Sequence, residues 1–199
     1  MGFPLLQTQA SKIIFQFIKL HLNFKNERFF LFDIIHFIEL FPTSELFGLL
    51  IVDLKRLLNK NEKLNNGYIL SKEIVELLKE NRLGTILFKP FISVYEFIER
   101  ILELSSLSID YLNKIDSKKN KSIIYSYERF TLIFNKIIAF EEDKSFIKNL
   151  DELKLILNSL LKFEKINFNT DPFNKIQIMG LLETRLLDFE NVIITNLNE

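Results

Sequence analysis

Apolar residues recur at helical spacing along most of the chain. In residues 5–24 the large apolar side chains follow a period near 3.6, with lysines and His21 on the remaining arc. Residues 26–41 are apolar almost all round, which is typical of a helix surrounded by other elements. Pro42 ends that stretch, and a further helix is indicated over residues 46–59. The pattern therefore predicts three helices in the first 60 residues.

The middle of the chain departs from this spacing. Residues 61–70 contain an Asn-Asn-Gly turn signal, and a short helix is predicted to follow over residues 71–82. Gly84 is typical of a helix end, and residues 85–88, just before a proline, fit an extended strand. We therefore expect a small β-hairpin, or wing, near residues 67–90.

Four more helices are predicted beyond residue 90. They are expected over residues 90–115, 122–140 and 145–165, with the last beginning at Pro172. The later three carry apolar seams at alternating spacings of three and four. The seams are Ile123, Tyr127, Phe130, Phe134 and Ile137; Phe146, Leu150, Leu153, Leu157 and Leu160; and Ile176, Met179, Leu182, Leu186, Phe189 and Ile193. Similar lengths and short polar loops favour an antiparallel up-and-down bundle.

These elements predict an all-α, multi-helix domain of about eight helices. A chain of 199 residues fits one domain, and its 21 Phe residues can fill a substantial core. We therefore expect a single helical domain over residues 1–199. The alternative is a division into an N-terminal lobe over residues 1–90, helical or winged-helix-like, and a four-helix bundle over residues 91–199.

Composition narrows the classes of function. The absence of cysteine excludes disulfides, Cys-ligated zinc, iron–sulfur clusters and thiol nucleophiles, and it suits a reducing compartment such as the cytoplasm. Acidic and basic residues balance at 26 each, so no net field draws the protein to nucleic acid or to an anionic membrane. No apolar stretch approaches the roughly 20 residues of a transmembrane helix. We expect a cytoplasmic location and no membrane span.

Catalytic motifs are missing from the sequence. The five glycines are too scattered for a phosphate-binding loop, and neither Gly-x-Ser-x-Gly nor His-Glu-x-x-His occurs. We therefore expect a protein that is not an enzyme and that needs no cofactor. A site assembled from dispersed Asp, Glu and Arg residues remains the open alternative.

One group of polar residues has the spacing of a metal site. Asp33, His36 and Glu39 fall on one stripe of an otherwise apolar helix, where carboxylates flank an imidazole. Metal binding would need further ligands, and the only other histidine is His21. The favoured interpretation is that these three residues form the solvent-facing stripe of a mostly buried helix.

The leading functional hypothesis is a non-enzymatic interaction or structural subunit. The first two helices carry more apolar surface than a bundle of this size needs, so a protein partner or a second copy is expected to cover part of it. The predicted anchors are Phe15, Phe17, Phe29, Phe30 and Phe37.

Two other kinds of partner remain open. Residues 46–90 could form a winged-helix-like nucleic-acid binder, with basic residues contacting phosphates. The candidate contacts are Lys55, Arg56, Lys60, Lys63, Lys72 and Lys79. Interspersed glutamates weaken that basic character. Aromatic-rich helices can also enclose an apolar small molecule, and the sequence leaves this open.

Overall fold

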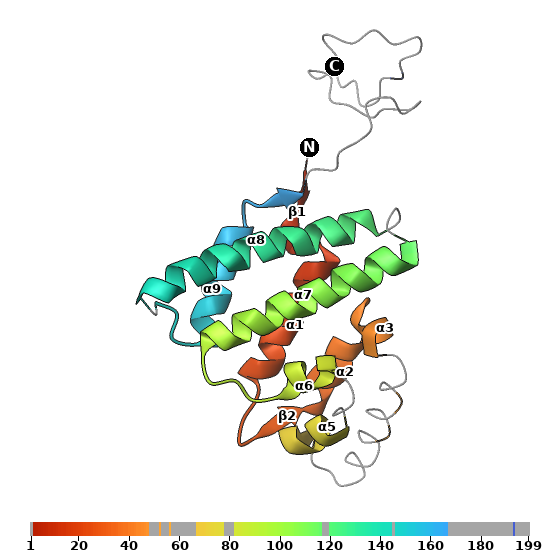
Figure 1. Cartoon of the computed structure of the whole chain (residues 1–199), viewed down its shortest axis with the longest axis vertical. Helices are drawn as coiled ribbons and strands as arrows, with labels where there is room; N and C mark the ends of the chain where they lie inside the picture. The colour runs from red at the N-terminus through yellow and green to blue at the C-terminus, as the bar shows by residue number, and fades with distance from the viewer. Residues whose placement is uncertain are drawn as a thin grey trace, which may run out of the picture. The chain divides into compact units, whose positions relative to one another are not determined.

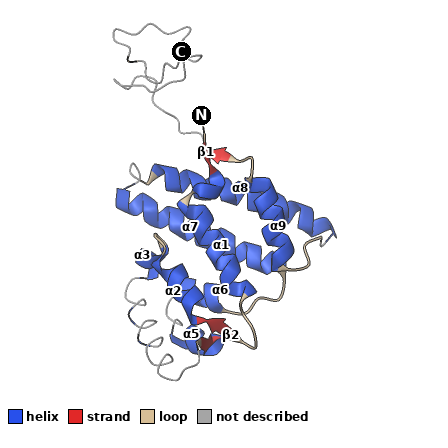
Figure 2. Ribbon diagram, turned by 180° about the vertical axis from the view of Figure 1, so that it is seen from behind, coloured by secondary structure: helices blue, strands red, loops and turns tan. Residues whose placement is uncertain are grey.

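Helices dominate the computed structural model. The residues that it describes are 2–47, 67–77, 82–116, 120–144 and 146–166, together with Val52, Arg56 and Ile193. They contain eight α-helices and two short two-stranded ladders (Figures 1 and 2). The predicted all-α, multi-helix fold is confirmed. All of these elements belong to one compact unit, Met1–Phe168; residues Asn169–Glu199 form a second unit.

The first helix, α1 (Gln9–Leu22), starts later than predicted. Its N-cap is Thr8, whose Oγ1 accepts a hydrogen bond from the Ser11 amide at 3.2 Å. The preceding residues form strand β1 (Phe3–Pro4) and a single 3₁₀ turn, η1 (Leu5–Gln7). The predicted start at Leu5 was therefore four residues early, because the cap at Thr8 determines where the helix begins.

The helix predicted over residues 26–41 is wrong in its first five residues. Asn26 and Glu27 have positive φ angles of 50° and 61°, so the backbone turns there instead of coiling. Strand β2 (Arg28–Phe30) follows and pairs antiparallel with β3 (Tyr68–Leu70). Phe29 and Phe30 fit either a buried helix or a strand, and here the distant partner strand β3 decides.

The remaining N-terminal helices are short. They are α2 (Leu31–Glu39), α3 (Thr43–Phe47), α5 (Ser71–Leu77) and α6 (Arg82–Phe88). The helix predicted over residues 46–59 lies mostly outside the described residues. Within that range, Val52 and Arg56 are described and are helical.

The predicted wing needs one correction. A short strand, β3, does occur within the predicted region 67–90, but it pairs with β2 and not with residues 85–88. Those residues belong to α6, with Gly84 inside the helix. Pro90 follows the end of α6 by two residues, so it restricts Lys89 without preventing a helix before it.

Two long helices, α7 (Val94–Asp116) and α8 (Lys121–Lys144), lie side by side and run in opposite directions (Figure 1). The predicted end of α7 and start of α8 were each within one residue, whereas α7 begins four residues after residue 90 and α8 continues four residues past Phe140. The seam residues Tyr127, Phe130 and Phe134 of α8 are fully buried, as the spacing indicated. The antiparallel arrangement is thus confirmed for this pair.

The last described helix, α9 (Leu150–Leu161), is shorter than the predicted 145–165. Its N-cap is Asn149, and strand β4 (Lys165–Ile166) follows it and pairs with β1. The helix predicted from Pro172 lies outside the described residues. Because α9 begins at Leu150, Phe146 of the predicted seam is not helical.

Helix α1 joins the two halves of this unit. It packs against α2 on one side and against α8 and α9 on another. Its Ile14, Phe17 and Ile18 are fully buried in a single core that extends from α2 to α9. No helix among the described residues is both long and apolar enough to cross a membrane.

Candidate interaction surface

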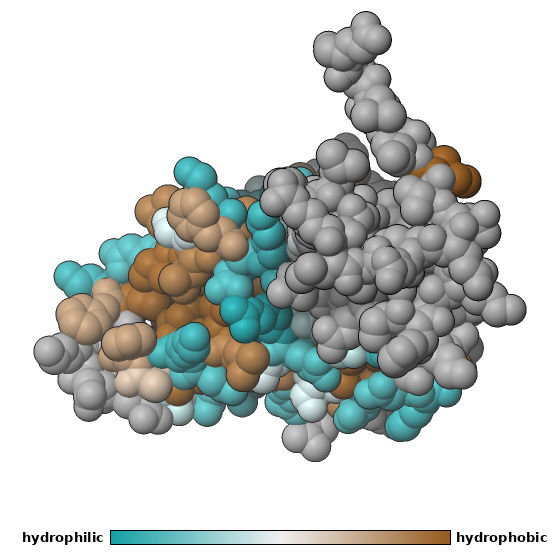
Figure 3. Space-filling model, turned by 90° about the horizontal axis from the view of Figure 1, so that it is seen from above, coloured by the Kyte–Doolittle hydropathy of each residue, from teal (hydrophilic) through white to brown (hydrophobic). Residues whose placement is uncertain are grey.

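An open apolar groove of about 330 Å³ lies between α8 and α9. Apolar residues from both helices and from the segment between them form most of its lining. The lining residues are Ile133, Lys136, Ile137, Phe140, Phe146, Ile147, Ile156, Leu160 and Glu164. In Figure 3, hydrophobic side chains gather on this face inside a border of hydrophilic residues.

The floor and the walls of the groove differ in exposure. Ile133, Ile137 and Ile147 are buried and form the floor. Phe140 and Phe146 are 72% and 61% exposed, and Leu160 is 45% exposed. Single exposed apolar residues are common, but several large ones around a recess are typical of a binding surface. The groove is therefore the strongest candidate site among the described residues.

Two charged residues line the groove. Lys136 comes from α8, is exposed, and makes no ion pair with a described residue. Glu164 lies beyond the end of α9, where its Oε2 accepts hydrogen bonds from Nε and Nη2 of Arg129 at 2.9 and 2.7 Å. Glu164 Oε1 accepts no hydrogen bond from the described residues. Lys136 and Glu164 Oε1 can therefore each make one more polar contact.

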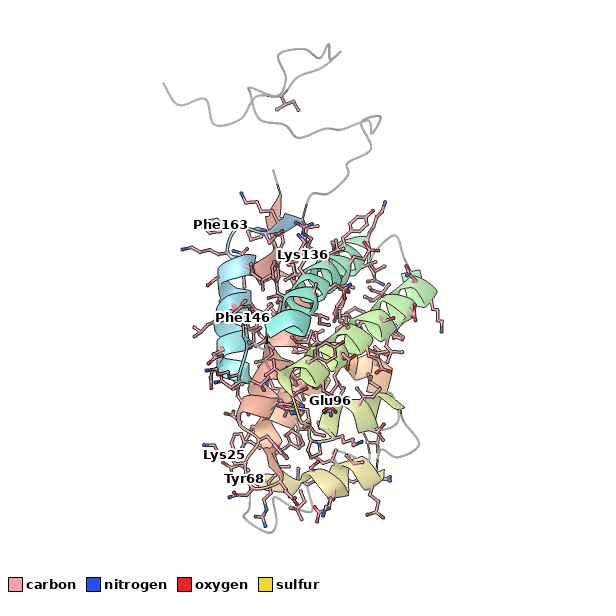
Figure 4. All side chains as sticks on the ribbon, turned by 60° about the vertical axis from the view of Figure 1, so that its left-hand side comes forward. Lys25, Tyr68, Glu96, Lys136, Phe146 and Phe163 are labelled. Carbon is pink, nitrogen blue, oxygen red and sulfur yellow. The ribbon has the colours of Figure 1, made fainter. Side chains whose placement is uncertain are left out.

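The start of α9 explains why Phe146 projects into solvent. Asn149 Oδ1 accepts a hydrogen bond from the Glu152 amide at 2.9 Å, and Glu152 Oε2 accepts one from the Lys148 amide at 2.8 Å. The Asn149 cap sets the first helical residue at Leu150. Phe146 therefore stays in the connecting segment (Figure 4), and the adjacent Ile147 is buried.

The predicted anchor residues lie elsewhere, and three need correction. Phe17, Phe29 and Phe37 are fully buried in the core, so in this structure they cannot contact a partner. Phe17 packs against Phe97 and Phe37, with ring centroids 4.9 and 5.7 Å apart. Most large apolar side chains of α1 and α2 are buried within the same unit, whereas Phe32 of α2 is 66% exposed.

The other two predicted anchors, Phe15 and Phe30, are half-buried, and Phe15 packs against the core. The ring centroid of Phe30 lies 5.5 Å from that of Phe32 and 5.3 Å from that of Tyr68. This small aromatic cluster lies by the β2–β3 ladder, away from the groove. Neither Phe15 nor Phe30 is among the lining residues of the groove.

Sequence reasoning missed Phe140 and Ile156 as surface residues. It did identify Phe146 and Leu160, but as members of a buried seam. The Asn149-x-x-Glu152 capping box was a usable signal, because it places the helix start after Phe146. The exposure of Leu160 had no such signal, since the same spacing suits a covered seam and an open one.

The candidate metal ligands do not gather. Asp33 is buried against α1, where its carboxylate accepts a hydrogen bond from Asn23 Nδ2 at 2.6 Å and pairs with Lys19 Nζ at 3.0 Å. His36 and Glu39 are exposed. Within the part of the chain that the structure describes, no three His, Cys, Asp or Glu residues are placed to bind a metal ion. The prediction that all three residues face solvent was wrong for Asp33. Its carboxylate is buried, where Asn23 and Lys19 bind it.

The basic residues proposed for nucleic-acid binding are only partly described. Arg56 and Lys72 are exposed, whereas Lys55, Lys60, Lys63 and Lys79 lie outside the described residues. The winged-helix form of this hypothesis loses one component, because residues 85–88 are helical. Nucleic-acid binding itself stays a prediction.

His21 is a buried polar residue in the described core, and its pKa is strongly lowered. Its imidazole is surrounded by Phe17, Phe29, Phe91 and Phe97, with ring centroids 4.8 to 5.5 Å away. Nε2 lies 2.8 Å from the Leu87 carbonyl oxygen, which can only accept, so Nε2 carries the proton. Burial lowers the pKa of His21 to about 3, although this hydrogen bond partly opposes the shift. A neutral imidazole without solvent contact is a core group; its predicted position on a polar arc was wrong.

Comparison with known proteins gives no relative from which a role could be transferred. No protein-family model, no curated protein and no solved structure matches this chain.

Proposed function

We propose that this protein is a non-enzymatic helical interaction subunit whose α8–α9 groove binds the apolar face of a helix from a protein partner. The observation that carries the proposal is the combination of a recess with projecting apolar walls, Phe140, Phe146 and Leu160. When a complementary helix fills the recess, the exposed apolar surface around it is removed from contact with water, which favours binding.

The dimensions of the groove suit a helix as ligand. Helix α9, which forms one wall, has 12 residues and so spans about 18 Å. A docked helix of similar length presents apolar residues at positions i, i+3, i+4 and i+7 along one face. Such a stripe matches an apolar floor that is bordered by helices on both sides.

The polar content of the groove supports a binding role without catalysis. Among the described residues, Lys136 and Glu164 are the charged ones that line it. A nucleophile paired with a base, which acyl or phosphoryl transfer would require, is not present among these lining residues. The absence of cysteine also supports the cytoplasmic location that we propose.

Binding of a model helix tests this function. The probe is a fluorescent synthetic peptide of about 15 residues, with Leu at the i, i+3, i+4 and i+7 positions and Gln and Glu elsewhere. We expect saturable binding with a Kd of roughly 1 to 100 µM, measured by fluorescence anisotropy at protein concentrations of about 1 µM and above. Phe146→Glu should weaken binding at least about tenfold, because it places a charge on the apolar wall.

The matched control is Phe32→Glu. Phe32 is 66% exposed, similar to Phe146, but it does not line the groove, so this variant should bind the peptide like the original chain. The proposal fails if the unmodified protein does not bind the peptide, or if both variants bind it equally well.

A further inference from the structure

The two charged residues that line the α8–α9 groove differ in how their charges are compensated. Glu164 is neutralised by the chain itself, because its Oε2 accepts hydrogen bonds from Nε and Nη2 of Arg129 on α8 at 2.9 and 2.7 Å. Lys136 is exposed and makes no ion pair with a described residue. The described lining of the groove therefore presents one uncompensated positive charge.

The sequence of α8 also leaves Lys136 without a partner on its own helix. Side chains three or four positions apart are neighbours on a helix surface, and a carboxylate at one of these positions would pair with the lysine. The four residues at these positions are all uncharged: Leu132, Ile133, Ala139 and Phe140. Two of them, Ile133 and Phe140, line the groove. The helical neighbours of Lys136 are thus apolar.

The Arg129–Glu164 pair shows which chemistry suits this side of α8. Arg129 and Lys136 are seven residues apart, so they lie on one stripe of the helix and are separated by about 10.5 Å along its axis. Glu164, from beyond the end of α9, supplies a carboxylate to the first position of that stripe. The second position, at Lys136, receives no carboxylate from the described residues. A helix that docks in the groove can supply one.

We infer that the partner of the α8–α9 groove is an acidic amphipathic helix, in which a Glu or Asp beside the apolar stripe pairs with Lys136. The inference rests on the proposed function and specifies the chemistry of the partner. The apolar stripe supplies most of the affinity, because it removes Phe140, Phe146 and Leu160 from water. The carboxylate adds selectivity, since a basic helix would bring a like charge to Lys136.

Two synthetic helices test this charge preference. Both are fluorescent peptides of about 15 residues with the same Leu stripe, and the residues that flank the stripe are Glu in one and Lys in the other. At low salt we expect the full chain to bind the acidic peptide about three to ten times more tightly than the basic one, measured by fluorescence anisotropy. Raising the NaCl concentration to about 1 M should bring the two affinities together, because salt screens the charges.

Substitution of the lysine gives the decisive comparison. Lys136→Glu should reverse the preference, so that the basic peptide binds more tightly, and Lys136→Gln should remove it. Because every variant is tested with the same two peptides, any difference between the peptides in helicity cancels. The matched control, Lys154→Glu, makes the same change in net charge at an exposed α9 position that does not line the groove, and should keep the preference for the acidic peptide.

Other outcomes separate the inference from the proposed function. If both peptides bind equally well and Phe146→Glu weakens both, the acidic partner is overturned while the interaction function stands. A preference that Lys136→Glu leaves unchanged arises elsewhere on the surface and also overturns the inference. If neither peptide binds, the proposed function and the inference fail together. A dimer in sedimentation velocity that Phe146→Glu dissociates would identify a second copy as the occupant and overturn the inference.

Discussion

The imidazole of His21 is neutral because the aromatic side chains around it exclude water. An imidazolium in this position would lose its hydration and gain only one carbonyl acceptor, from Leu87. The nearby Arg100 guanidinium further disfavours a second positive charge. Stability should therefore depend on pH in a range where an exposed histidine would have little effect.

The sign of that dependence follows from the two pKa values. Burial lowers the pKa of His21 from 6.5 to about 3, so between these values the unfolded chain binds more protons than the folded one. The free energy of unfolding should therefore fall as the pH drops below 6.5, by about 2 kcal/mol between pH 7 and pH 5. Urea unfolding followed by circular dichroism at several pH values measures this loss.

Replacing each histidine in turn identifies the source. His21→Asn should lower stability at neutral pH but flatten the dependence between pH 7 and pH 5, whereas His36→Asn, at an exposed position, should preserve the slope. An unchanged slope in His21→Asn would show that another group is responsible.

At the scale of elements, the start of α9 decides which apolar residues face the groove. The cap formed by Asn149 and Glu152 satisfies backbone amides at the start of the helix. Leu150, Leu153 and Leu157 then fall on the buried side, while Phe146 remains in the connecting segment. The position of the groove wall thus depends on a polar residue that does not line the groove.

Removal of that cap should be measurable as a loss of stability. Asn149→Ala leaves the Glu152 amide without its side-chain acceptor, so we expect the free energy of unfolding to fall by about 1 kcal/mol. Asn158→Ala is the matched control, because Asn158 is exposed inside the same helix. Alanine is the better helix former there, so the control should be neutral or slightly stabilising. Equal losses in both variants would contradict the assigned cap.

At the scale of the whole described unit, contacts between distant parts of the sequence close the fold. Strand β1 pairs with β4, and the Leu5 amide donates a hydrogen bond to the Glu164 carbonyl at 2.9 Å. The Leu5 side chain is fully buried, and its turn packs against α9. The N-terminal residues therefore stabilise the same end of α9 that carries Glu164.

Truncation of this side chain should destabilise more than its own turn. Leu5→Ala removes a fully buried side chain, so a loss of about 2 to 5 kcal/mol in the free energy of unfolding is expected. Leu155→Ala, at an exposed position of α9, should cost less than about 0.5 kcal/mol. Hydrogen exchange should accelerate at α1 and α9 amides in Leu5→Ala; acceleration limited to residues 2–8 would contradict this coupling.

The fold was predictable where a helix buries one regular stripe. Phe130 and Phe134 follow the spacing of α8, and burial on a neighbouring helix is the expected outcome of such a stripe. Residues 28–30 and 85–88 were mispredicted for a different reason. Phe29 and Phe30, and the residues between Gly84 and Pro90, fit either a strand or a helix. The distant segments that pack against them made the choice.

The candidate site was less predictable than the fold. Phe17 and Phe146 are the same residue type at similar helical spacing, yet one is fully buried and the other lines an open groove. Sequence spacing identifies an apolar face, but it does not identify which faces the rest of the chain covers.

The sequence by itself determined that this is a helical protein without cysteine chemistry and without net charge, because these properties depend only on composition and local periodicity. The tertiary structure alone decided that His21 and Asp33 are internal, that β2 finds its partner at β3, and that Phe140, Phe146 and Leu160 surround a groove. Burial and strand pairing depend on residues far apart in the chain, so no local pattern can specify them.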